Sequence, residues 1–106
     1  MKKIVSLNDG KRAVLDTETD SCLYADRRGL DPAHRQGIDL YMHLTKGGQR
    51  IFYKYVWSLY ENDVDYIEMI SEKEARKMLE EKSQWMTEDD VTIIKQVFPD
   101  FLEETA

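Results

Sequence analysis

Residues 36–60 read QGIDLYMHLTKGGQRIFYKYVWSLY, with hydrophobic side chains at alternate positions on both sides of the central KGGQ. Alternation with a period of two is typical of β-strands that bury one face. The glycines at 47 and 48 suit a two-residue turn, because glycine adopts positive φ without steric cost. The stretch therefore predicts a long β-hairpin around which the rest of the chain is organised.

The expected two-residue turn also sets the register of this hairpin. The predicted cross-strand pairs share one face and are Leu44 with Ile51, Met42 with Tyr53, Leu40 with Tyr55 and Ile38 with Trp57. We expect these pairs to form the core, because a slip of one residue would move every side chain to the other face. The opposite face should carry a mixed surface that meets water, a loop or a partner, formed by Asp39, Tyr41 and His43 against Val56, Lys54 and Phe52.

Local signals predict further strands before and after the hairpin. Residues 4–7 and 12–19 read as short strands joined at Asn8-Asp9-Gly10, and the edge of the sheet is expected there. Residues 21–26 form another candidate strand, with Cys22 and Tyr24 expected on one side, and residues 64–70 form the last. The order of the strands stays open.

Two helices are expected at the C-terminal end. Ser71 with Glu74 has the spacing of a capping box, Thr87 with Asp90 begins a second helix, and Pro99 ends it. The predicted apolar stripes are Ala75, Met78, Leu79 and Trp85, and then Val91, Ile94, Val97 and Phe98. The predicted fold class is α+β, a single domain over residues 1–106, in which an antiparallel meander with a long central hairpin has one face covered by two C-terminal helices.

Composition narrows the class of protein. The chain has 106 residues with 42% hydrophobic side chains and two prolines, which excludes disordered and low-complexity classes. Cys22 is the single cysteine, so an intrachain disulfide is excluded and a thiolate zinc site is disfavoured. No apolar run approaches the length that spans a membrane, and we expect a cytoplasmic protein without membrane association.

The net charge of −6 is unevenly distributed. Residues 1–54 hold ten Lys/Arg and seven Asp/Glu, whereas residues 55–106 hold five and fourteen. Direct DNA binding is therefore not expected, because nucleic-acid binders present a basic patch. The predicted partner-binding residues form two acidic groups, Glu61, Asp63, Asp65 and Glu68 after the hairpin, and Glu80, Glu81, Glu88 and Asp89 where the helices meet. If the helices pack back on the sheet, the two groups are expected to form one acidic surface.

Three acidic residues near the N-terminus raise the alternative of an enzyme. Asp16, Glu18 and Asp20 alternate on an expected strand and, with His34 or His43, would be the ligands of a metal-assisted phosphodiesterase or nuclease. Carboxylates along one strand diverge, whereas a metal site needs converging ligands. We therefore predict no metal, no cofactor and no catalytic residue.

Several fragments together resemble a family of small, mostly uncharacterised bacterial proteins encoded on phages, plasmids and other mobile elements. The fragments are Asp16-Thr17-Glu18-Thr19, Lys46-Gly47-Gly48 and the run from Ile70 to Ala75, a DTET…KGG…ISEKEA-like pattern. Asp20 departs from the pattern, in which a small residue follows. Most members have no assigned activity, so the resemblance implies a source and a fold more than a chemistry, and some mobile-element proteins of this kind are anti-CRISPR inhibitors.

These observations favour a non-enzymatic binding or inhibitor protein. Its expected partner is a host protein with a basic nucleic-acid-binding groove, a Cas effector being one candidate, which the acidic surface would engage. A dimeric structural or regulatory accessory protein is a further alternative, with a homodimer formed through the exposed hairpin face or an unpaired edge strand.

Overall fold

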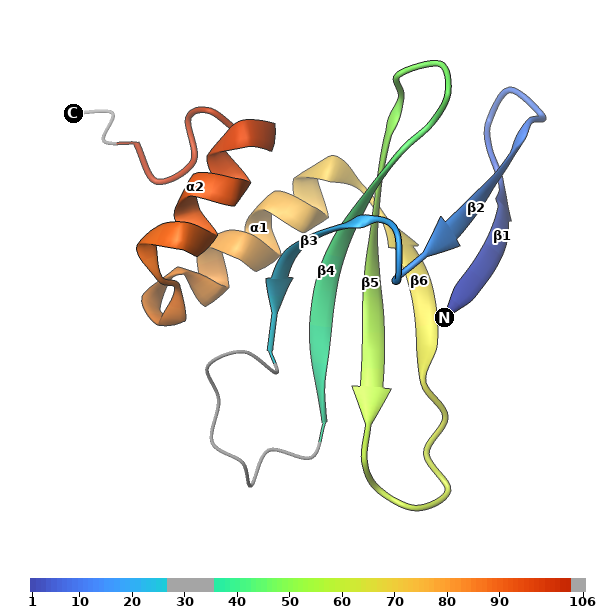
Figure 1. Cartoon of the computed structure of the whole chain (residues 1–106), viewed down its shortest axis with the longest axis horizontal. Helices are drawn as coiled ribbons and strands as arrows, with labels where there is room; N and C mark the ends of the chain where they lie inside the picture. The colour runs from blue at the N-terminus through green and yellow to red at the C-terminus, as the bar shows by residue number, and fades with distance from the viewer. Residues whose placement is uncertain (27–35, 104–106) are drawn as a thin grey trace.

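The protein is described by a computed structural model that covers residues 1–26 and 36–103 (Figure 1). The strands are β1 (Lys2–Ser6), β2 (Arg12–Asp16), β3 (Ser21–Ala25), β4 (Gln36–Leu44), β5 (Arg50–Ser58) and β6 (Tyr66–Ile70). The helices are α1 (Glu72–Lys82), the short 3-10 helix η1 (Ser83–Trp85) and α2 (Glu88–Val97). The predicted α+β class, with antiparallel strands followed by two C-terminal helices, is confirmed.

The strands form two antiparallel sheets. The larger has the order β3-β4-β5-β6, which is a simple meander, and among the described strands β1 pairs with β2 alone. The prediction that the sheet has its edge at residues 4–19 is therefore wrong. Instead the β1–β2 hairpin packs on a face of the larger sheet, where Val5 and Leu15 join Tyr53 in a shared core. Burial of these apolar side chains favours this docking over continued strand pairing.

The β4–β5 hairpin is present, but its register is one residue away from the prediction. Met42 pairs with Phe52 and Tyr41 with Tyr53. The Thr45 N–H donates to the Gln49 carbonyl over 2.9 Å. Of the glycine pair in the turn, Gly48 alone has positive φ, at 86°. The loop is thus three residues long and closes with a single left-handed glycine, which is the second common hairpin geometry.

This register buries apolar residues on both faces of the sheet. The core under the helices contains Leu23, Tyr24, Leu40, Phe52, Ala75, Leu79, Ile94, Phe98 and Phe101. The core under the β1–β2 hairpin contains Val5, Ala13, Leu15, Ile51, Tyr53 and Ile67. The predicted single core was wrong, because Leu40 faces the helices and Tyr53 faces the small hairpin.

Strand β3 contains a bulge that the sequence did not indicate. Cys22 pairs with Tyr41 and Tyr24 with Leu40, so Leu23 has no opposite residue. Leu23 and Tyr24 both enter the core under the helices, and Cys22 lies across from Tyr41. The prediction that Cys22 and Tyr24 share a side is wrong, because a bulge changes the alternation of side chains.

The helix starts agree with the capping signals. Ser71 Oγ accepts a hydrogen bond of 3.1 Å from the Glu74 N–H, and Thr87 with Asp90 forms a reciprocal capping box. Trp85, expected in the buried stripe of the first helix, is 53% exposed. That prediction is wrong, because α1 ends at Lys82 and the tighter η1 turn changes the direction of the following side chains. Among the described residues, no helix has the length and apolar character needed to cross a membrane.

Candidate protein-binding surface

Large hydrophobic residues are exposed at the end of the sheet where β5 connects to β6. These residues are Leu59, Tyr60, Val64 and Tyr66, and Val64 is 81% exposed. The segment from Leu59 to Tyr66 interleaves them with acidic side chains. Exposed apolar groups that gather in one place mark interaction sites, and tyrosine is enriched at protein interfaces. We call residues 59–66 with Glu68 the β5–β6 surface.

Hydrogen bonds connect the β5–β6 surface to the end of β5. Asp65 accepts one bond of 2.5 Å from the Tyr55 hydroxyl and another of 3.0 Å from the Ser58 N–H. The Ser58 hydroxyl donates to Asp63 Oδ2 over 2.7 Å. Asn62 adopts a left-handed φ of 73°, which asparagine tolerates in tight turns. A surface that is ordered before binding loses less conformational entropy when a partner binds.

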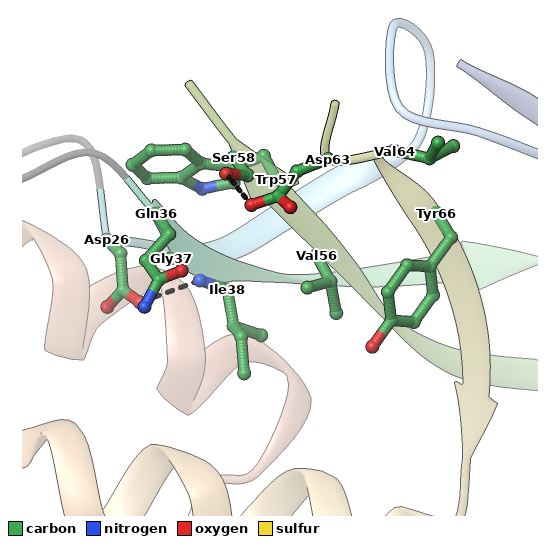
Figure 2. Close-up of a pocket in the computed structure, with 10 residues that line it drawn as sticks. All are labelled: Asp26, Gln36, Gly37, Ile38, Val56, Trp57, Ser58, Asp63, Val64 and Tyr66. Atoms are coloured by element: carbon green, nitrogen blue, oxygen red, sulfur yellow. Dashed lines mark hydrogen bonds between the residues drawn. The ribbon is translucent and has the colours of Figure 1, made fainter. Parts of the chain in front are cut away.

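A pocket of about 550 Å³ adjoins this surface, at the end of the sheet where β4 begins and β5 ends. Figure 2 shows Ile38, Val56 and Tyr66, from three neighbouring strands, pointing to the same side of the sheet. Val64 and Trp57 complete its apolar lining. The volume lies in the range of pockets that hold small ligands.

Among the described residues, two carboxylates line the pocket, and they differ in their surroundings. Asp26 is 5% exposed, accepts a hydrogen bond of 2.7 Å from the Ile38 N–H, and forms an ion pair with Lys82 at 3.1 Å. Asp63 is exposed and is held through one oxygen by the Ser58 hydroxyl. The Lys82 ammonium balances the charge of Asp26, so Asp63 supplies the negative charge that a ligand would meet.

The first predicted acidic group lies within the β5–β6 surface. Glu61 and Asp63 are exposed in the loop. The Glu68 carboxylate lies 3.5 Å from Lys54 Nζ and is 55% exposed. Asp65 is half-buried, and its two oxygens accept hydrogen bonds from the Tyr55 hydroxyl and the Ser58 N–H, so it ties the loop to β5. The sequence did not indicate the exposed apolar residues between these acids, although Leu59, Tyr60 and Val64 stand out as apolar residues within a polar turn.

The second predicted acidic group lies elsewhere. Glu80 and Glu81 are in the last turn of α1, and Glu88 and Asp89 are in the first turn of α2. In Figure 1 this junction lies beyond β3, whereas the β5–β6 loop lies at the far end of β5 and β6. The two groups thus form separate surfaces, because the helices extend past the β3 edge of the sheet.

Asp16, Glu18 and Asp20 do not share a strand face. Strand β2 ends at Asp16, and residues 17–20 form a turn, so the predicted strand over residues 12–19 was too long. Asp16 Oδ1 accepts from the Glu18 N–H over 3.0 Å, and Asp20 Oδ2 accepts from the Asp16 N–H over 2.8 Å. Within residues 1–26 and 36–103, no three His, Cys, Asp or Glu side chains are placed to hold a metal ion. His34 lies outside the described residues.

Asp20 instead joins three parts of the fold. Its carboxylate accepts from the Tyr53 hydroxyl at 2.7 Å and lies 2.8 Å from His43 Nδ1. The Tyr53 ring stacks on Tyr41 with centroids 5.4 Å apart. Burial alone would raise the pKa of Asp20, but hydrogen bonds from Asp16, Tyr53 and His43 hold it below 3.8. Burial and then the Asp20 carboxylate raise the pKa of Tyr53, and burial raises the pKa of Tyr41 to about 12. The cluster connects the β2–β3 turn to β4 and β5.

We expect Asp20→Asn to lower the free energy of unfolding by about 1–3 kcal/mol at pH 7, because hydrogen bonds to a charged group contribute in that range. The folded-state pKa of Asp20 lies below its ordinary value, so its ionised form stabilises the fold above 3.8. This contribution is lost as the pH falls through the folded-state pKa. The difference between the wild type and the variant should therefore shrink below pH 3.8.

Denaturant unfolding followed by circular dichroism at several pH values tests this expectation. The exposed Glu18 is the matched control, and Glu18→Gln should change the free energy of unfolding by less than about 0.5 kcal/mol. A loss for Asp20→Asn that stays constant with pH would show that the charge of Asp20 contributes nothing to stability.

Comparison of the chain with protein-family models, with curated proteins and with solved structures finds no match to any of them.

Proposed function

We propose that the chain is a non-enzymatic binding protein whose acidic surface engages a basic nucleic-acid-binding groove on a host protein. The main observation in support of this proposal is the β5–β6 surface. There, the exposed residues Leu59, Tyr60 and Val64 lie beside the carboxylates of Glu61 and Asp63. Apolar contacts supply affinity, and complementary charge supplies specificity and fast association. A groove that holds a phosphate backbone offers Lys and Arg side chains to such a surface.

The resemblance to proteins of phages and other mobile elements supports a host protein as the target. In this proposal the partner is a nucleic-acid-binding host protein, such as a Cas effector, and the chain acts in the cytoplasm as an anti-CRISPR-type inhibitor. Binding would compete with DNA or RNA, because both ligands use the same basic groove.

A homodimer through the exposed hairpin face has less support. That face carries Tyr41 and Tyr53 and is packed under the β1–β2 hairpin. The β6 edge is also partly covered, since Lys3 Nζ donates to the Ile67 carbonyl over 2.9 Å. A lysine at a strand edge opposes pairing with a second strand.

Charge reversal tests the proposal and separates the two acidic groups. One variant combines Glu61→Lys with Glu68→Lys on the β5–β6 surface, and a second combines Glu80→Lys with Glu81→Lys at the helix junction, which changes the net charge by the same amount. We expect the first variant to associate about tenfold more slowly with the basic partner and to show a weaker salt dependence, because electrostatic steering raises association rates by 10-fold or more. The second variant is the control for net charge, and circular dichroism verifies that both variants are folded.

The measurement uses purified heparin-binding proteins of a bacterial host as probes in surface plasmon resonance, with double-stranded DNA as the competitor. The proposal requires that DNA displaces the chain from its partner. For a Cas effector, target cleavage in vitro should fall as the chain is added. Unchanged association rates for both variants, or binding that DNA does not disturb, would overturn the proposal.

A further inference from the structure

From the lining of the pocket beside the β5–β6 surface, we infer that it receives an arginine side chain of the basic partner. This inference rests on the proposed function and adds the group that the partner inserts. The pocket of about 550 Å³ combines apolar walls with a carboxylate, which suits a side chain with an apolar stem and a cationic end.

The apolar walls match the stem of an arginine. Ile38 and Val56 are half-buried and stand side by side, since they pair across β4 and β5. Tyr66 continues the row through its pairing with Val56 and is 48% exposed, so its ring is accessible. A guanidinium stacks favourably on an aromatic face, which contributes about 0.5–1 kcal/mol at an exposed site.

The charge of the pocket selects a cation. Asp63 lines the pocket, and the hydrogen bond that its Oδ2 accepts from the Ser58 hydroxyl fixes the position of the carboxylate. Asp26 is the second carboxylate in the described part of the lining, and Lys82 already balances its charge. A cation that enters would therefore meet Asp63 first. A planar guanidinium can form two hydrogen bonds with a carboxylate, whereas an ammonium acts as a point charge, so arginine is favoured over lysine.

The rigidity of the pocket supports a role in recognition. Trp57 packs so closely across Gly37 that a Cβ at residue 37 would lie 2.6 Å from its Cζ2 atom. Trp57 Nε1 also donates to Asp39 Oδ1 over 3.0 Å, which fixes the indole. One end of the pocket is therefore built from buried, hydrogen-bonded groups. A pocket that is formed before binding holds a side chain at a lower entropic cost.

A peptide titration followed by NMR tests the inference. The probe is the peptide acetyl-Ala-Arg-Tyr-Arg-Ala-amide, and its analogues carry lysine or the neutral isostere citrulline in place of arginine. We expect saturable shifts of the backbone amides of Ile38, Val56, Val64 and Tyr66. Affinity should fall at least fivefold with citrulline and at least twofold with lysine.

Variants of the chain assign the binding to the pocket. Asp63→Asn removes the charge and keeps an oxygen for the Ser58 hydroxyl, and Tyr66→Ala removes the exposed ring. Each should weaken binding of the arginine peptide at least threefold. Leu44→Ala is the control, because Leu44 is exposed at the opposite end of β4, outside the β5–β6 surface, and does not line the pocket. It should change the affinity less than twofold.

These experiments can test the arginine site separately from the proposed function on which it rests. Equal binding of the arginine and citrulline peptides, shifts away from the pocket, or no effect of Tyr66→Ala would overturn the arginine site. The arginine site can fail while the charge-reversed β5–β6 variant still associates slowly with the host protein, and the proposed function then stands without the pocket. If the charge reversal also leaves the association rate unchanged, the arginine site and the proposed function are both wrong.

Discussion

Trp57→Ala is expected to lower the free energy of unfolding by about 3–5 kcal/mol, the range for truncating a large aromatic side chain in a core. Trp57 is 2% exposed and covers Gly37 on the neighbouring strand. Its indole N–H donates to Asp39, which is itself 5% exposed. The substitution therefore leaves a cavity and also removes a hydrogen bond from a buried carboxylate, which adds to the loss.

Trp85→Ala is the matched control for this experiment. Trp85 is 53% exposed, and its ring lies 5.6 Å from Lys82 Nζ. A cation–π contact at an exposed site contributes about 0.5–1 kcal/mol, so the variant should lose no more than that. Chemical denaturation monitored by circular dichroism compares the two variants. Similar losses at both positions would mean that the end of the sheet near Trp57 is not packed as described.

Phe101→Ala should destabilise the protein by a similar amount, about 3–5 kcal/mol. Phe101 is fully buried and contributes to the core that contains Leu79, Ile94 and Phe98. It follows Pro99, and its N–H donates to the Phe98 carbonyl over 3.0 Å in a turn beyond α2. The turn brings the ring back into the core under the helices, so truncation leaves a cavity there.

Leu102→Ala provides the comparison one residue further along. Leu102 is 50% exposed, so truncation should change the free energy of unfolding by less than about 0.5 kcal/mol. In thermal unfolding, Phe101→Ala should lower Tm by many degrees, whereas Leu102→Ala should leave Tm nearly unchanged. Equal Tm values for Phe101→Ala and the wild type would show that the C-terminal turn is not part of the core.

The secondary structure of this chain could be predicted largely from local signals. The capping residues Ser71 and Thr87 determine where the helices begin, because a side-chain oxygen there satisfies backbone N–H groups that have no partner within the helix. Asp9-Gly10 and Gly47-Gly48 mark the tips of two hairpins for an equally local reason, the left-handed backbone that glycine adopts easily. These interactions involve residues close in sequence, so the sequence displays them directly.

The register of the central hairpin could not be predicted in this way. Strand β5 has apolar or aromatic residues at 51, 52 and 53 in succession, so a shift of one residue still places apolar groups on either face. The observed register depends on two coverings, the helices on one face and the β1–β2 hairpin on the other. Both coverings come from segments distant in sequence.

In the candidate site, too, some features could be predicted from the sequence and others depend on tertiary structure. The charge asymmetry of the sequence pointed to Glu61, Asp63 and Glu68 because charge is a property of composition and needs no contacts. The pocket beside them depends on the pairing of Ile38 with Val56 and of Val56 with Tyr66, which joins three strands. The acidic and apolar character of this end of the protein was thus determined by the sequence, whereas its shape was decided by strand pairing and by packing on both faces of the sheet.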